Sequence, residues 1–160
     1  MMPHVHMSLR PKENSTPDYL KIMIQKRPDT IQVLLIDDSI SIRNTLRNIL
    51  NPYNRINVAA EAGDVSTAIK IVKKGFEGIA VIDINFYESY GIKLVKIIKK
   101  IRPEMPVIFL SFQSDIRYLQ ESFKGGASGF VIKERAYEDL PNAIISVADG
   151  ANFISIDVVP

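Results

Sequence analysis

The chain has 160 residues, and its hydrophobic fraction of 46% and charged fraction of 24% are ordinary for a globular protein with a real core. It has no cysteine, which excludes disulfides and thiolate metal sites. Residues 1–30 hold five Lys/Arg and three Asp/Glu, and the rest of the chain holds fifteen of each sign. A neutral body lacks the clustered cations that bind nucleic acid, so we do not expect this chain to bind DNA by itself.

No apolar run approaches the roughly 18 residues of a membrane span. The first residues, "MMPHVHMSLRPKEN", lack the apolar middle of a secretory signal. We therefore expect a cytoplasmic location and no membrane partner.

Residues 1–30 carry four prolines and no sustained periodicity, which predicts a flexible or partly helical extension. A short helix is predicted over Pro17–Arg27, with the proline in its first turn. His4 and His6 form an alternate-residue pair. We interpret the pair as incidental, because a closed metal site usually needs more ligands.

After Thr30, apolar strands alternate with amphipathic helices. Strands are predicted over 31–36, 56–62, 78–84, 106–111 and 129–133, and helices over 39–50, 64–75, 91–101, 115–126 and 137–150. Asp64 or Ser66 should cap the second of these helices, and Gly75 should end it. Strict alternation predicts an α/β fold with a doubly wound, five-stranded parallel sheet and five helices on its two faces. Ligands of such folds bind beyond the carboxyl ends of the strands.

Polar side chains stand at the carboxyl ends of four predicted strands. Asp37 and Asp38 follow the first strand, Asp83 ends the third, Ser111 the fourth and Lys133 the fifth. Three carboxylates, a hydroxyl and an ammonium should therefore converge on one edge of the sheet. The carboxylates repel one another, and Mg²⁺ would relieve that repulsion while keeping positions for phosphate oxygens. Asp83 is central and is the best-placed nucleophile for accepting a phosphoryl group.

From about Ile31 to Gly150 the chain resembles the receiver domain of two-component response regulators. The matching stretches are "LLIDDS", "VIDINFYESYG", "VIFLSF" and "GASGFVIK", in this order. The resemblance implies a flavodoxin-like strand order 2-1-3-4-5. The tail "ADGANFISIDVVP" is similar to the segment by which regulators with a helix-turn-helix output leave their receiver. We accordingly expect a receiver domain over 31–150 and the start of a linker or tail over 151–160.

The resemblance implies that Asp83 is the phosphoacceptor and that Mg²⁺ is the cofactor. Asp38 would bind the metal directly, Asp37 mainly through water, and Asp83 and the main-chain carbonyl of Asn85 would complete the protein ligands. The domain would be a signalling switch rather than a conventional enzyme, catalysing only its own phosphorylation and dephosphorylation. Its phosphoryl donor would be a sensor histidine kinase or a phosphotransfer protein.

Three further side chains acquire roles by the same resemblance. Ser111 and Lys133 would contact the phosphoryl group. Ser111 would also act in the switch with Phe130, which falls three residues before the lysine, where the family keeps an aromatic ring that rotates inward on activation.

The implied partners include a second copy of the domain. A homodimer could form through the helix over 115–126, the strand over 129–133 and the helix over 137–150, or through the helices over 39–50 and 137–150. Contact with DNA would require an output domain that this chain does not contain.

Phe112 departs from the family pattern, because a small residue normally follows the position of Ser111. We interpret Phe112 as an access gate that slows both the entry of a phosphoryl donor and the hydrolysis of the product. An outward ring that forms a partner surface with Tyr118 is the other possibility.

The same residues allow other interpretations. The acid pair and Ser39 could merely cap the following helix. A flavodoxin-like electron carrier is disfavoured, because "DDS" would repel a flavin phosphate. A phosphatase with an aspartate nucleophile would need a second acid where Asn85 stands. The remaining functional alternative is a degenerate receiver that serves as a phosphorylation-independent interaction scaffold.

Overall fold

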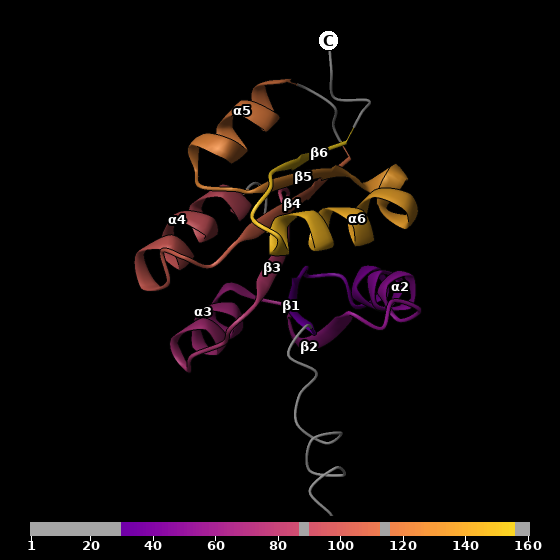
Figure 1. Cartoon of the computed structure of the whole chain (residues 1–160). Helices are drawn as coiled ribbons and strands as arrows, with labels where there is room; N and C mark the ends of the chain where they lie inside the picture. Colours follow the sequence, from indigo (N-terminus) through magenta and orange to yellow (C-terminus); the bar gives the residue numbers. More distant parts are fainter. Residues whose placement is uncertain (1–29, 87–89, 113–115, 156–160) are drawn as a thin grey trace, which may run out of the picture.

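A computed structural model describes residues 30–86, 90–112 and 116–155 (Figure 1). One parallel sheet runs through the molecule in the strand order β2-β1-β3-β4-β5-β6. The strands are β1 (Ile31–Ile36), β2 (Ile56–Ala62), β3 (Ile79–Asp83), β4 (Val107–Ser111), β5 (Gly129–Ile132) and β6 (Phe153–Ile154). The helix predicted over Pro17–Arg27 and the His4–His6 pair lie outside the described residues.

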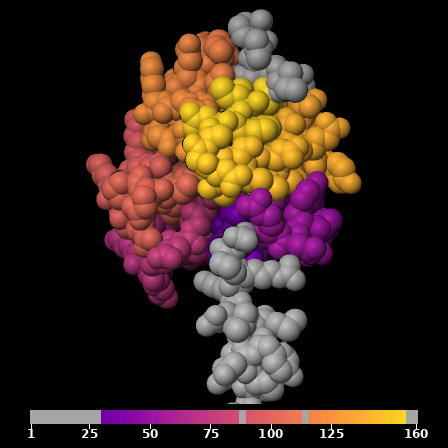
Figure 2. Space-filling model, viewed as in Figure 1, coloured from indigo at the N-terminus to yellow at the C-terminus, as the bar shows by residue number. Residues whose placement is uncertain are grey.

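Five α-helices cover the two faces of the sheet within the described residues (Figure 1). They are α2 (Ile40–Leu50), α3 (Val65–Lys73), α4 (Gly91–Ile101), α5 (Ile116–Lys124) and α6 (Ala136–Ala148), and a short 3₁₀ helix, η1 (Lys133–Arg135), precedes α6. Helices α3, α4 and α5 lie on one face, and α2 and α6 lie on the other. Figure 2 shows α2 beside the C-terminal elements. The predicted doubly wound α/β fold is confirmed.

Alternate residues of each central strand enter different cores, because successive strand side chains point to opposite faces. Leu34 and Ile36 of β1 pack toward α3, α4 and α5, and their neighbours Val33 and Leu35 pack toward α2 and α6. All four side chains are buried. The continuous apolar run that opens the domain is thus explained by burial on both faces.

Two helices begin at side-chain caps. Ser39 Oγ accepts a hydrogen bond from the Ile42 amide at 3.3 Å, and Asp64 Oδ1 accepts one from the Thr67 amide at 2.7 Å. The prediction of a cap at Asp64 or Ser66 is therefore resolved in favour of Asp64. Because Ser39 supplies the α2 cap, the two preceding aspartates are free for another role.

Gly91 lets α4 begin close to the end of β3. A Cβ at this position would lie 2.6 Å from the main-chain oxygen of Asp83 and 2.9 Å from that of Ile84, closer than any side chain allows. Glycine at the first residue of α4 therefore brings this helix up to the carboxyl edge of the sheet.

The sheet has six strands within the described residues, rather than the five predicted. β6 pairs in parallel with β5, with Gly129 opposite Phe153 and Phe130 opposite Ile154. Two residues are too few to show a strand period in the sequence, and this strand is held by main-chain pairing and by the buried Ser155 that follows it. Among the described helices, none combines the length and apolar character needed to span a bilayer.

Candidate functional site

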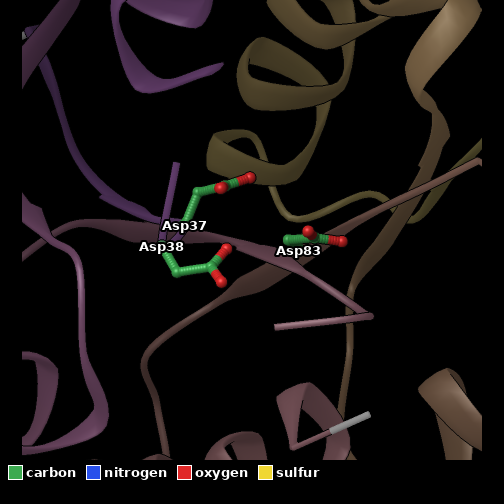
Figure 3. Close-up of side chains that lie close together, drawn as sticks. All are labelled: Asp37, Asp38 and Asp83. Carbon is green, nitrogen blue, oxygen red and sulfur yellow. The ribbon is translucent and has the colours of Figure 1, made fainter. Parts of the chain in front are cut away.

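Three carboxylates meet at the carboxyl edge of the sheet, as Figure 3 shows. Asp37 and Asp38 follow β1, and Asp83 is the last residue of β3. One oxygen from each residue lies within 4.8 Å of one from each of the others. Asp37 and Asp83 are buried, and Asp38 is exposed. Of the three carboxylates, Asp38 is therefore the one that solvent reaches in the described part of the chain.

Lys133 supplies a positive charge inside this cluster. Its Nζ lies 3.0 Å from Asp83 Oδ2 and 3.8 Å from Asp37 Oδ2, and only 8% of its side chain is exposed. The short η1 helix that follows β5 delivers the lysine to the same edge as the aspartates. The Lys133 ammonium therefore forms ion pairs with two buried carboxylates, of which Asp83 is the closer.

Loop amides hold the remaining oxygens of the two buried aspartates. Ser39 N donates to Asp37 Oδ1 at 2.8 Å, and Asn85 N donates to Asp83 Oδ1 at 3.0 Å. Both are turns in which an aspartate accepts from the amide two residues on. The turns fix the carboxylates with respect to the backbone before any ligand binds.

Asp37 Oδ2 is buried and has no hydrogen-bond partner among the described residues. Burial raises the pKa of Asp37 above its ordinary value, and the opposing effects of the Ser39 amide and Lys133 do not cancel this rise. A buried oxygen without a hydrogen bond, facing two more carboxylates, fits a hard divalent cation with oxygen ligands. The residues present therefore suit Mg²⁺.

Ser111 and Phe130 are both fully buried. Ser111 ends β4 beside β5, where it is opposite Ile132. Phe130 packs in the core between the sheet and the layer that contains α4 and α5. The ring of Phe130 is therefore already turned inward in this structure. Asn85 follows the site in the loop after β3 and is exposed.

Phe112 lies over the lysine of the site. The Lys133 Nζ is 4.5 Å from the centroid of the Phe112 ring, a cation–π contact, and 55% of Phe112 is exposed. Both residues line a cavity of about 240 Å³ beside α2. Tyr118 packs instead against the core under α5.

Arg43 on α2 also contacts the loop that carries the acid pair, and the sequence pattern did not identify it as a site residue. Its Nη1 donates to the main-chain oxygen of Asp37 at 2.5 Å. The signal available in the sequence was an arginine four residues after the helix cap, on the turn of α2 nearest the acid pair. That signal is weak, because most arginines at such positions face solvent.

Comparisons with known proteins agree with this architecture. The transcriptional regulatory protein MctR of Rhizobium johnstonii is 29% identical over 128 residues, which cover 80% of this chain and 60% of MctR. The transcriptional regulatory protein DegU of Brevibacillus brevis is 29% identical over 130 residues, 81% of this chain and 55% of DegU. The chain thus spans somewhat more than half the length of these relatives.

Among solved structures, the isolated REC domain of RcsB from Salmonella enterica serovar Typhimurium, in its apo form, superimposes with a TM-score of 0.74 at 26% identity. The alignment covers 81% of this chain and 96% of that domain. The same domain in the presence of the phosphomimetic BeF₃⁻ gives a TM-score of 0.73. The profile of the response regulator receiver domain matches residues 33–145. The chain belongs to the family of response regulator receiver domains.

Proposed function

We propose that this receiver domain is a phosphorylation switch of a two-component system, with Asp83 as the phosphoacceptor. One observation carries the proposal: the Asp83 carboxylate stands at the carboxyl edge of the sheet, paired with Lys133 at 3.0 Å and grouped with two further carboxylates. A nucleophilic carboxylate needs fixed positive charge near the phosphoryl oxygens and an open side for the donor. The exposed side at Asp38 supplies the opening.

The chemistry follows from the charges of these residues. An oxygen of Asp83 attacks the phosphorus of a phosphohistidine on a sensor kinase or phosphotransfer protein. A P–O bond forms as the P–N bond breaks, and the imidazole nitrogen keeps the electron pair and takes up a proton. Asp83 thereby loses its carboxylate charge, so Lys133 can turn to the phosphoryl oxygens, with the Ser111 hydroxyl as a further donor.

Mg²⁺ would be held by Asp37, Asp38, Asp83 and the main-chain carbonyl of Asn85. When bound, it neutralises charge on the phosphoryl oxygens. The protein residues fix the position of the acceptor oxygen, because the turn amides of Ser39 and Asn85 orient two of these carboxylates.

Ser111 and Phe130 carry the switch in this proposal. The two residues lie on β4 and β5, which are paired neighbours. A shift of Ser111 toward a phosphoryl group would therefore change the packing around the Phe130 ring. The readout surface would be the face of α5, β5 and α6, or that of α2 and α6, used for homodimerisation. DNA would be bound by an output domain, and a solved structure of RcsB shows two dimers bound to two parallel DNAs.

Intact-mass spectrometry after incubation with a small acyl phosphate and Mg²⁺ tests the proposal. We expect one phosphoryl adduct, absent in Asp83→Asn and absent in excess chelator. Asp149→Asn is the matched control, because Asp149 is an exposed aspartate after the far end of α6. Equal labelling of wild type and Asp83→Asn would refute the assignment. A wild type that takes up nothing from either a small donor or a histidine kinase would favour the scaffold function.

A further inference from the structure

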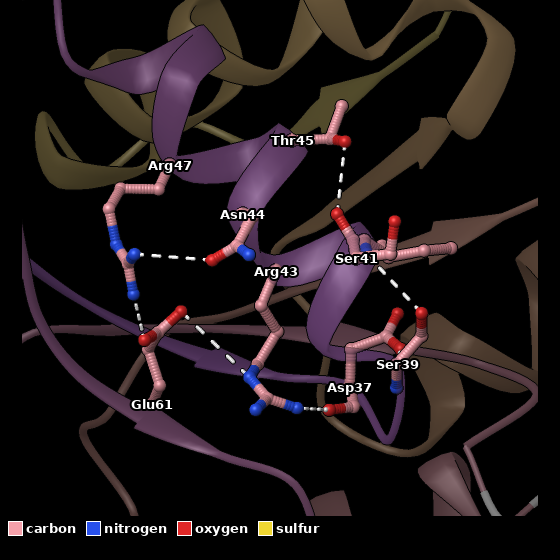
Figure 4. A network of polar contacts seen from close by, with 9 residues as sticks. Asp37, Ser39, Ser41, Arg43, Asn44, Thr45, Arg47 and Glu61 are labelled. Carbon is pink, nitrogen blue, oxygen red and sulfur yellow. Dashed lines mark hydrogen bonds and ion pairs between the residues drawn. The ribbon is translucent and has the colours of Figure 1, made fainter.

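The loop that carries both acidic residues after β1 is tied to helix α2 by one side chain. Arg43 reaches back from the first turns of α2, and its Nη1 donates to the main-chain oxygen of Asp37 at 2.5 Å (Figure 4). This carbonyl belongs to the peptide that joins Asp37 to Asp38. The hydrogen bond therefore fixes the peptide on which the orientation of both carboxylates depends.

The guanidinium occupies a closely fitting site. Only 15% of the Arg43 side chain is exposed, and its Nε lies 3.9 Å from Glu61 Oε1 on β2. A Cβ on Gly63 would lie 3.1 Å from Arg43 Nη1, so the absence of a side chain at this position leaves room for the guanidinium. Three elements thus define its position: the loop after β1, the end of β2 and helix α2.

Glu61 is shared with a second arginine. Arg47, one turn further along α2, pairs with Glu61 Oε2 and hydrogen-bonds Asn44 (Figure 4). Arg47 makes no hydrogen bond or ion pair with the acid pair in the described part of the chain. Arg47 has the same charge, helix and acidic partner as Arg43, and it differs in lacking the hydrogen bond to Asp37.

The geometry points to Arg43 as a positioning residue for the cation site: it holds the peptide after Asp37 so that both acids face Asp83 before a cation binds. This inference rests on the proposed function, in which Asp37 and Asp38 are metal ligands. Without the tether the loop would have to be ordered by the cation, and part of the binding free energy would be used for that ordering. A planar guanidinium can reach the carbonyl and Glu61 together, which an ammonium does less well.

Removing the charge of Arg43 would itself strengthen cation binding and mask the loss of geometry, so the test keeps the charge constant. The variants are Arg43→Lys and Gly63→Ala, which crowds the guanidinium, with Arg47→Lys as the matched control. Two measurements are made on each protein. Mg²⁺ affinity is obtained by calorimetric titration, and exchange of the Ser39 amide hydrogen is followed by NMR in metal-free buffer.

We expect Arg43→Lys to weaken Mg²⁺ binding about fivefold, which is about 1 kcal/mol, and to speed exchange of the Ser39 amide. Gly63→Ala should change both quantities in the same direction, and Arg47→Lys should stay within about twofold of wild type. If Arg43→Lys matches Arg47→Lys in both measurements, the positioning role is overturned and the proposed function stands. If wild type binds no Mg²⁺, the proposed metal site itself is overturned.

Discussion

Replacing Lys133 by methionine should destabilise the metal-free protein. The lysine ammonium lies 3.0 Å from Asp83 and 3.8 Å from Asp37, in a place where only 8% of its side chain is exposed. At an effective dielectric constant of about 20, opposite unit charges 3.0 Å apart attract by about 5.5 kcal/mol. Desolvation of the two groups offsets part of this attraction. Because the variant leaves two buried carboxylates unpaired, we expect it to lower the free energy of unfolding by about 3 kcal/mol.

Magnesium should reverse much of this loss. Lys133 and a cation compete for the same carboxylates, so the variant should bind Mg²⁺ more tightly than wild type and regain stability when Mg²⁺ is added. Urea unfolding followed by far-ultraviolet circular dichroism, with and without chelator, measures both effects. Lys96→Met, which removes an exposed lysine on α4, is the control and should change the midpoint little. Equal midpoints for Lys133→Met and wild type in chelator would show that the ion pairs contribute nothing net.

Three further predictions follow from the site and from β6. Phe112→Ala should speed both uptake of a small acyl phosphate and loss of the phosphoryl group, since the Phe112 ring centroid lies 4.5 Å from Lys133 Nζ. Equal or slower rates in the variant would show that Phe112 is not an access gate. Burial raises the pKa of Asp37, so metal-free Asp37→Asn should unfold at higher urea than wild type at neutral pH. That gain in stability should vanish as pH falls through about 4, because the Asp37 carboxyl of the wild type is then protonated in both the folded and the unfolded state. A gain that persists in acid would show that burial of the Asp37 charge is not its cause. Ser155→Ala should cost about 2 kcal/mol in urea unfolding, because the buried Ser155 Oγ accepts from Ile132 N at 3.0 Å and donates to Asp139 at 2.7 Å; a loss no larger than that of Ser146→Ala would count against it.

Much of the architecture could be predicted because its signals are local. Strand and helix periods alternate regularly, and three predicted elements, Ile31–Ile36, Ile56–Ala62 and Gly91–Ile101, have the predicted bounds. β6 was not predicted because a strand of two residues is too short to show the alternation of a strand. It is held by pairing with β5, whose residues lie more than twenty positions earlier in the chain.

The sequence by itself determined that Asp37, Asp38, Asp83 and Lys133 would meet, because alternation dictates a parallel sheet and parallel strands end at one edge. Only the tertiary structure decided how these groups differ. Asp37 is buried and Asp38 exposed although they are adjacent, a difference that depends on how the loop after β1 lies against the rest of the fold. The contact of Arg43 with the Asp37 carbonyl likewise depends on how α2 packs beside β2, where Gly63 leaves space for the guanidinium. Such differences arise from distances between separate elements, and no local pattern in the sequence specifies those distances.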